Sequence, residues 1–180
     1  MQWIPTELPE VKVLEPAVFG DDRGLFMELF RESWFAELGV EGPFLQDNFS
    51  RSVQGVLRGL HYQIQEPQGK LVRVLAGEIF DVAVDLRRSS PNFGRWTGRT
   101  LSAANKLALW IPAGFGHGFY TVSAVAEVMY KCTSYYAPQY DRNVRWDDPA
   151  IGIHWPLNAP VQLSDKDKQA PLLADADVFI

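Results

Sequence analysis

Cysteine, long apolar runs and an excess of basic charge are scarce or absent in this 180-residue chain, and each shortage excludes a class of protein. The single cysteine, Cys132, cannot form a disulfide within the chain and fits a reducing compartment. No apolar run approaches the roughly 18 residues of a membrane span, and the start of the chain lacks the basic and apolar regions of a signal peptide. The formal net charge of −5 argues against binding to nucleic acid. We therefore expect a cytoplasmic protein with neither membrane nor nucleic-acid partners.

The hydrophobic content of 47% is enough for one sizeable core, but 180 residues fall short of a convincing pair of domains. The sequence contains no internal repeat and no low-complexity tract. From about residue 138 the chain is rich in Pro, Asp and Asn, which is typical of ordered loops. We predict a single domain over residues 1–180, with an N-terminal arm at about 1–14 and a C-terminal extension at about 138–180.

Short β-type runs separated by Gly, Pro, Asn and Asp predict an all-β sandwich or barrel. Ser33 is expected to cap a short helix that stops at Gly39, and a second helical turn is expected from Ser164. In one run the alternation predicts a face that packs (Phe80, Val82, Val84, Leu86) and a face that can be wet (Asp81, Ala83, Asp85). The predicted strands are 11–16, 25–31, 44–50, 55–63, 70–76, 78–87, 96–102, 107–112, 118–122 and 127–136.

Three segments have the spacing of metal-ligand motifs with the ligands themselves replaced: His61-x-Gln63, Lys70 with Gly77 seven residues on, and Pro112-x-Gly114-x-x-His117. The pattern resembles a metal-binding cupin, which carries H-x-H, then Glu with Gly seven residues on, then His after P-x-G-x-x. A protonated lysine offers a metal no lone pair, so we expect no bound metal. The remaining histidine and lysine suit removal of a proton next to a carbonyl.

Nine blocks follow one another along the chain: FGDDRG (19–24), QDNFS (46–50), VLRGLHYQ (56–63), QGKLVRV (68–74), FDVAVDLRRSSPNFGRW (80–96), LWIPAGFGHGF (109–119), YKCTSYYAP (130–138), RWDDPAIGIHWP (145–156) and LSDKD (163–167). In order and spacing they resemble the dTDP-4-dehydrorhamnose 3,5-epimerase family. The resemblance extends from about Glu15 to Leu173. Its specificity is high because so many separate blocks occur in the expected order.

The resemblance implies a cupin-type jelly roll with a few short helices, no metal or nucleotide cofactor, and a homodimer. It also implies inversion of C3 and C5 of dTDP-4-dehydro-6-deoxy-D-glucose to give dTDP-4-dehydro-L-rhamnose. One alternative is an epimerase that acts at C3 or C5 alone. A metal cupin, such as a dioxygenase or isomerase, is disfavoured by Gln63 and Lys70. A cupin that binds a sugar nucleotide without turnover is a third possibility.

Inversion of a carbon beside a ketone needs a base and a partner for the enolate oxygen. His61 fits the base, since an imidazole with an ordinary pKa of about 6.5 is largely neutral at physiological pH. The resemblance assigns orientation of the base to Asp167, the enolate contact to Lys70 and the general acid to Tyr130. Each has a structural alternative: a core histidine, a helix-capping acid after Ser164, a surface lysine and a packed strand tyrosine.

The resemblance also indicates residues that hold the substrate, and charge and shape support some of them. Arginine forks suit a diphosphate, and a flat tyrosine ring suits thymine. Asp141 stands where the family often has Glu, which shortens that contact by a methylene. His117 could instead be paired with Asp81 or a backbone carbonyl. The set is Arg23, Glu28, Gln46, Asp47, Asn48, Arg58, His117, Tyr136, Asp141 and Lys166.

Overall fold

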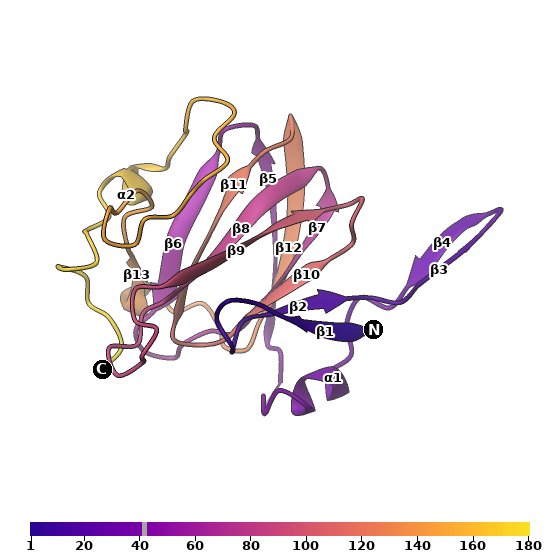
Figure 1. Cartoon of the computed structure of the whole chain (residues 1–180), viewed down its shortest axis with the longest axis horizontal. Helices are drawn as coiled ribbons and strands as arrows, with labels where there is room; N and C mark the ends of the chain where they lie inside the picture. The colour runs from indigo at the N-terminus through magenta and orange to yellow at the C-terminus, as the bar shows by residue number, and fades with distance from the viewer. Residues whose placement is uncertain (41–42) are drawn as a thin grey trace.

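The computed structural model describes residues 1–40 and 43–180, and its body consists of two antiparallel β-sheets that pack face to face (Figure 1). The six-stranded sheet has the order β1 (Gln2–Pro5), β2 (Lys12–Glu15), β10 (Ala108–Ile111), β7 (Lys70–Ala76), β12 (Val125–Cys132) and β5 (Gln46–Val53). The five-stranded sheet has the order β13 (Asp141–Asn143), β6 (Leu57–Gln63), β11 (Phe115–Thr121), β8 (Glu78–Asp85) and β9 (Trp96–Ser102). The arrangement confirms the predicted all-β, cupin-type jelly roll.

The remaining elements are short: the hairpin of β3 (Val18–Asp21) and β4 (Gly24–Met27), the helices α1 (Ser33–Ala36) and α2 (Asp165–Lys168), and the 3₁₀ turn η1 (Pro138–Tyr140). Ser33 is the first residue of α1 and not its cap, because Glu32 occupies the N-cap position. Ser164 does cap α2, since its hydroxyl oxygen accepts a hydrogen bond from the Asp167 N–H at 3.1 Å. Within the described ranges, no helix is long and apolar enough to cross a membrane.

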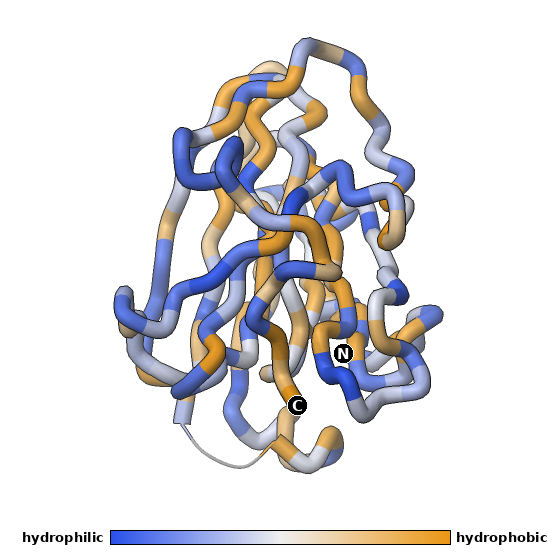
Figure 2. The backbone as a smooth tube through the Cα atoms, turned by 90° about the vertical axis from the view of Figure 1, so that its left-hand side faces the viewer, coloured by the Kyte–Doolittle hydropathy of each residue, from blue (hydrophilic) through white to orange (hydrophobic). Residues whose placement is uncertain are grey.

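The main hydrophobic core lies between the two sheets, because each sheet turns alternate residues of its strands inward. Val72 and Val128 from the six-stranded sheet pack with Ile79, Ala83 and Phe119 from the five-stranded sheet, and none of them is more than 3% exposed. Figure 2 shows hydrophobic and hydrophilic positions interleaved along the strands. The period-2 pattern in the sequence therefore places one side of each strand in this core.

The prediction of a wet face on β8 is wrong, because both of its faces are buried. Val82 and Val84 pack outward against the C-terminal extension, which covers this sheet with Val144, among others. Asp81 and Asp85 point inward and are 0% exposed. Each buried carboxylate has a bonding partner, a histidine for Asp81 and the guanidinium of Arg87 for Asp85, as burial of charge requires.

The predicted N-terminal arm, residues 1–14, contains strand β1 and most of strand β2. Strands β1 and β2 pair with each other, and β2 also pairs with β10 at the edge of the six-stranded sheet. The segment that projects from the body is instead the β3–β4 hairpin (Figure 1). It exposes large apolar side chains, with Phe19 at 65% and Phe26 at 70%. Such exposure is unusual for a monomer and indicates a contact surface.

Candidate active site

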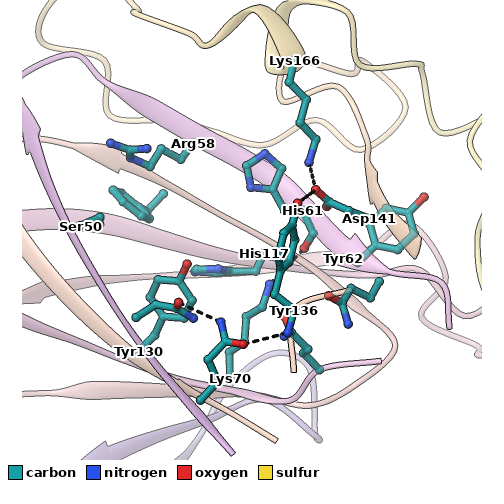
Figure 3. Close-up of a pocket in the computed structure, with 15 residues that line it drawn as sticks. Ser50, Arg58, His61, Tyr62, Lys70, His117, Tyr130, Tyr136, Asp141 and Lys166 are labelled. Carbon is teal, nitrogen blue, oxygen red and sulfur yellow. Dashed lines mark hydrogen bonds and ion pairs between the residues drawn. The ribbon is translucent and has the colours of Figure 1, made fainter. Parts of the chain in front are cut away.

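A cavity of about 390 Å³ lies within the jelly roll and collects most of the predicted site residues (Figure 3). Its walls come from β5, β6, β7, β11, β12, β13 and α2, and from the loops that precede β7 and follow β12. The predicted residues that line it are Gln46, Asn48, Arg58, His61, Lys70, His117, Tyr130, Tyr136, Asp141 and Lys166. Antiparallel pairing thus gathers side chains from distant parts of the sequence around one space.

Arg58 and His61 both face the cavity, although they lie three residues apart on β6. In a regular strand, residues three apart point to opposite faces. The pairing of β6 with β11 shifts register between these two positions, and Gly59 adopts φ +136° there. A Cβ at Gly59 would lie 2.5 Å from the Cα of Gly118, so the position requires glycine. This local irregularity lets one short strand present both functional groups.

His61 is held by Asp167, which lies 106 positions away in the sequence. The distance from His61 Nε2 to Asp167 Oδ1 is 2.5 Å, and Asp167 is only 3% exposed. The second carboxylate oxygen accepts a hydrogen bond from Ser164 Oγ at 2.9 Å. Asp167 therefore contacts both the helix cap, as its structural alternative expected, and the imidazole that the family resemblance has it orient.

The Asp167 carboxylate determines which nitrogen of His61 is free. Because the carboxylate accepts the proton on Nε2, the lone pair of the neutral ring lies on Nδ1. Burial lowers the pKa of His61, and the bond to Asp167 opposes that shift. Burial would raise the pKa of Asp167, but hydrogen bonds from His61 and Ser164 hold it below its usual value. The arrangement suits a neutral imidazole that accepts a proton at Nδ1.

Lys70 is nearly enclosed, with 8% of its surface exposed. Its Nζ lies 3.5 Å from the backbone oxygen of His61, and within the described part of the chain it forms no ion pair. Burial lowers the pKa of Lys70, while the nearby Cys132, Asp141 and Asp81 oppose the shift. An amine that faces a cavity without a bonded carboxylate can stabilise a negative charge that develops there.

Tyr130 reaches the cavity from β12, where it lies opposite Asn48 on β5. Its ring packs against the main core, and its centroid lies 6.4 Å from that of the His117 ring. Burial raises the pKa of the Tyr130 phenol, so the hydroxyl stays protonated and able to donate. Tyr130 therefore packs in its strand, as its structural alternative expected, and also lines the cavity.

A second histidine–carboxylate pair lies next to the first. His117 on β11 is directly opposite His61 on β6, and both line the cavity. The Nε2 atom of His117 lies 2.7 Å from Oδ1 of the fully buried Asp81. The predicted alternative partner of His117 is confirmed. Its place in the cavity also leaves it available to a ligand.

Gln63 occupies a cupin ligand position but bonds to the backbone. Its amide nitrogen donates to the carbonyl oxygens of Glu66 at 2.8 Å and Tyr135 at 3.2 Å, and its amide oxygen accepts from Ala137 N at 2.7 Å. Gln63 therefore braces the segment after β12. Among the described residues, no three His, Cys, Asp or Glu side chains gather as a metal ion would require.

The other side of the cavity carries a small polar network. The hydroxyl of Tyr136 donates to Asp141 Oδ2 at 3.0 Å, and Lys166 pairs with the same carboxylate. The Tyr136 ring is 55% exposed and free to stack on a flat ligand. Arg58 lies on the opposite side in Figure 3, anchored by a 3.1 Å hydrogen bond from Nε to Ser52 Oγ. Cationic side chains thus line the cavity on two sides, Lys166 on one and Arg58 on the other.

Three predicted binding residues lie outside this cavity. Arg23 is at the tip of the β3–β4 hairpin, where it pairs with Asp21, and Glu28 pairs with Arg31 just after the hairpin. Asp47 lies on the outer face of β5 because its neighbours in the strand point inward. The tertiary structure of one chain therefore does not bring these three residues to the site.

Apart from Gln63, which the sequence placed only in a cupin ligand position, sequence reasoning missed four residues that line the cavity: Ser50, Tyr62, Gln68 and Phe119. Ser50 could have been found, because it continues the period-2 pattern of Gln46 and Asn48 on a predicted strand. The other three offered no separate signal, since each lies within a block already assigned to a strand or turn.

Fold and cavity together define the class of this protein: a cupin-type jelly roll whose ligand positions hold a histidine bound to a carboxylate, an amide and a lysine. The family model for dTDP-4-dehydrorhamnose 3,5-epimerase matches residues 5–175. This chain therefore belongs to the dTDP-4-dehydrorhamnose 3,5-epimerase family.

Individual proteins of that name are similar over the whole chain. A dTDP-4-dehydrorhamnose 3,5-epimerase from Pseudomonas aeruginosa is 56% identical over 173 residues, which cover 96% of each chain. One from Neisseria gonorrhoeae is 55% identical over 177 residues, 98% of this chain, and the chain spans only 54% of that longer relative. The crystal structure of dTDP-6-deoxy-D-glucose-3,5-epimerase from Legionella pneumophila, in complex with dTDP-4-keto-L-rhamnose, is 54% identical with a TM-score of 0.95, and the match covers 98% of this chain and 94% of that one.

Proposed function

We propose that this chain is an isomerase that inverts C3 and C5 of dTDP-4-dehydro-6-deoxy-D-glucose and yields dTDP-4-dehydro-L-rhamnose, with no metal or nucleotide cofactor. The observation that carries the proposal is the His61–Asp167 pair, 2.5 Å apart, at a cavity that Lys70 also lines. The Legionella relative, with dTDP-4-keto-L-rhamnose bound, supports the substrate class. The substrate suits the site because C3 and C5 both flank the ketone, which makes their C–H bonds acidic.

In the proposed mechanism, His61 removes the proton. Its Nδ1 lone pair takes the hydrogen from the sugar carbon, and the Asp167 carboxylate holds the proton on Nε2 and stabilises the imidazolium that forms. The electrons of the broken C–H bond move onto O4. Lys70, close to the backbone of His61, supplies the positive charge that stabilises this enolate oxygen.

Tyr130 returns a proton to the carbon from the opposite face, which inverts the centre. Tyr130 comes from β12 of the six-stranded sheet and His61 from β6 of the five-stranded sheet, so the two side chains approach the cavity from different walls. The raised pKa of the phenol keeps it protonated until a carbanion is present. After each inversion His61 and Tyr130 regain their starting protonation by exchange with solvent.

The nucleotide is held by residues on two sides of the cavity. We assign stacking of thymine to Tyr136 and diphosphate binding to Arg58, since a forked cation suits phosphate oxygens. Lys166, on the side of Tyr136, is a further contact. Gln46 and Asn48 offer amide groups to the sugar or the base. His117 and Asp141 are further contacts.

We also propose a homodimer in which Arg23 and Glu28 act on the partner's cavity. Both residues lie on or next to a hairpin that projects from the body (Figure 1), and that hairpin exposes Phe19 and Phe26. The edge strand β5 exposes further apolar side chains, with Phe49 at 61%. A second copy would cover these surfaces. Sedimentation equilibrium tests the dimer, and a monomer at micromolar concentration would contradict it.

The residues support two smaller proposals. The chain is a single functional domain, because the cavity takes walls from both sheets and from the C-terminal extension. It works in the cytoplasm, where the free, buried thiol of Cys132 would stay reduced.

The deciding experiment supplies dTDP-4-keto-6-deoxyglucose to the protein in heavy water and follows C3 and C5 by NMR. Deuterium at both carbons with inversion of both is the expected result. Deuterium at one carbon alone would identify a single-centre epimerase, which could use the same His61, Lys70 and Tyr130. Binding without exchange would identify a protein that holds sugar nucleotides without turnover.

A further inference from the structure

The inner face of β5 is polar along its whole length. In this strand Gln46, Asn48, Ser50 and Ser52 are the less exposed residues, and the residues between them are exposed. The first three line the cavity. Strand faces that point into a jelly roll are normally apolar, because a buried polar group without a hydrogen bond is destabilising. Each polar side chain on this face therefore calls for a partner.

Most of these side chains have one. The amide nitrogen of Gln46 donates to Asn48 Oδ1 at 2.9 Å, and Ser52 Oγ accepts from Arg58 Nε at 3.1 Å. The hydroxyl of Ser50 is different. It is buried, and nowhere in the described chain does it find a hydrogen-bond partner.

The surroundings of Ser50 indicate where its partner would come from. Across the strand pair Ser50 lies opposite Val128, whose side chain has no polar atom to form a hydrogen bond. In Figure 3 Ser50 is on the same side of the cavity as Arg58, away from Lys166 and Asp141. An unsatisfied hydroxyl on a residue that lines the same side of a cavity as an arginine matches a ligand rich in acceptor oxygens.

We propose that Ser50 binds the substrate, and that its hydroxyl donates a hydrogen bond to a diphosphate oxygen held beside Arg58. The inference rests on the proposed function and adds a binding residue to the same site. A phosphate oxygen only accepts hydrogen bonds, so it satisfies the Ser50 donor while Arg58 supplies the charge. The thymine end is served by Tyr136 on the other side of the cavity, which leaves the hydroxyl to the diphosphate.

The test compares the Ser50→Ala variant with wild type by titration calorimetry against dTDP and against thymidine. We expect the Kd for dTDP to rise about tenfold, equivalent to ~1.4 kcal/mol, and the Kd for thymidine to stay the same. Without ligand, the melting temperature should be unchanged or higher, because the substitution removes an unpaired buried hydroxyl. Lower affinity at equal or greater stability separates a binding role from a structural one.

Thr121→Val is the matched control. Thr121 on β11 is 0% exposed and also carries a buried hydroxyl for which the described residues offer no partner, but it does not line the cavity. Its replacement should leave both Kd values unchanged. An unchanged dTDP Kd in Ser50→Ala overturns the inference, and an equal loss for thymidine overturns the assignment to the diphosphate. Absence of dTDP binding in wild type would instead overturn the proposed function.

Discussion

Replacement of Asp167 by Asn tests whether the carboxylate makes His61 a base. The substitution keeps the shape of the side chain but removes the charge that lies 2.5 Å from His61 Nε2. A hydrogen bond to a charged group contributes about 2 kcal/mol, so the loss should slow proton removal by about 30-fold. The loss should be larger where the new amide nitrogen faces the ring, because Nδ1 then carries the proton and cannot act as base.

The assay is the rate of deuterium entry at C3 and C5 as a function of pH. Asp167 raises the pKa of His61 against the effect of burial, so its removal should lower that pKa further. Exchange needs the neutral imidazole, because only that form can accept a proton. The acid limb of the pH–rate profile should therefore move to lower pH in the variant, and the maximal rate of deuterium entry should fall. The shift in pH profile distinguishes loss of the charge from a general disturbance of the site.

A neighbouring carboxylate provides the control for this experiment. Asp165 lies in the same helix α2, but it is exposed and pairs with Lys168 at the surface. Asp165→Asn should leave both the rate and the pH profile unchanged. The reasoning fails if Asp167→Asn exchanges within about threefold of the wild-type rate, because a lost charge-assisted bond of this kind costs more.

Three further predictions follow from the proposed roles. Tyr130→Phe should form product about 100-fold more slowly while deuterium still enters from the His61 side, and an unchanged ratio of deuterium to inverted sugar, with both rates near wild type, would remove the phenol from the mechanism. The purified protein should hold no stoichiometric metal and keep its activity in strong chelator, because Lys70 and Gln63 replace two cupin ligands; about one metal ion per chain, with activity lost on chelation, would contradict this. His61→Asn should bind dTDP but lose exchange of deuterium at C3 and C5. If Arg23 acts on the partner's site, mixing this variant with Arg23→Ala should restore activity, because one site of a mixed dimer then has both an intact His61 and an intact Arg23. Mixtures no more active than their components would place Arg23 outside the partner's site.

The strands and the family could be read from the sequence because both depend on local pattern. The runs 70–76 and 96–102 were predicted to the residue, since both are short runs that contain β-branched and apolar residues and lie between turn signals. The helical turn after Ser164 followed from its cap. Strands β1, β3 and β13 were missed, because each is short and held by its pairing with a neighbouring strand more than by its own composition.

The burial of side chains and the contacts between distant residues could not be predicted from local sequence pattern. The alternation in β8 identified two faces correctly, but only the packed C-terminal extension shows that both are buried. The pairing of His61 with Asp167 was implied by resemblance alone, since no local pattern connects positions 106 residues apart. The position of Arg58 beside His61 was equally hidden, because it depends on a register shift at Gly59.

The amino-acid sequence by itself determined the strand pattern, the replacement of the cupin metal ligands and the membership in an epimerase family, because periodicity and motif spacing are properties of neighbouring residues. The tertiary structure decided which side chains share the cavity and that Arg23, Glu28 and Asp47 lie outside it. It also decided that Ser50 lines the cavity and that its buried hydroxyl has no hydrogen-bond partner among the described residues. Those facts depend on sheet order and register, which bring together residues whose separation along the chain carries no information about their distance in space.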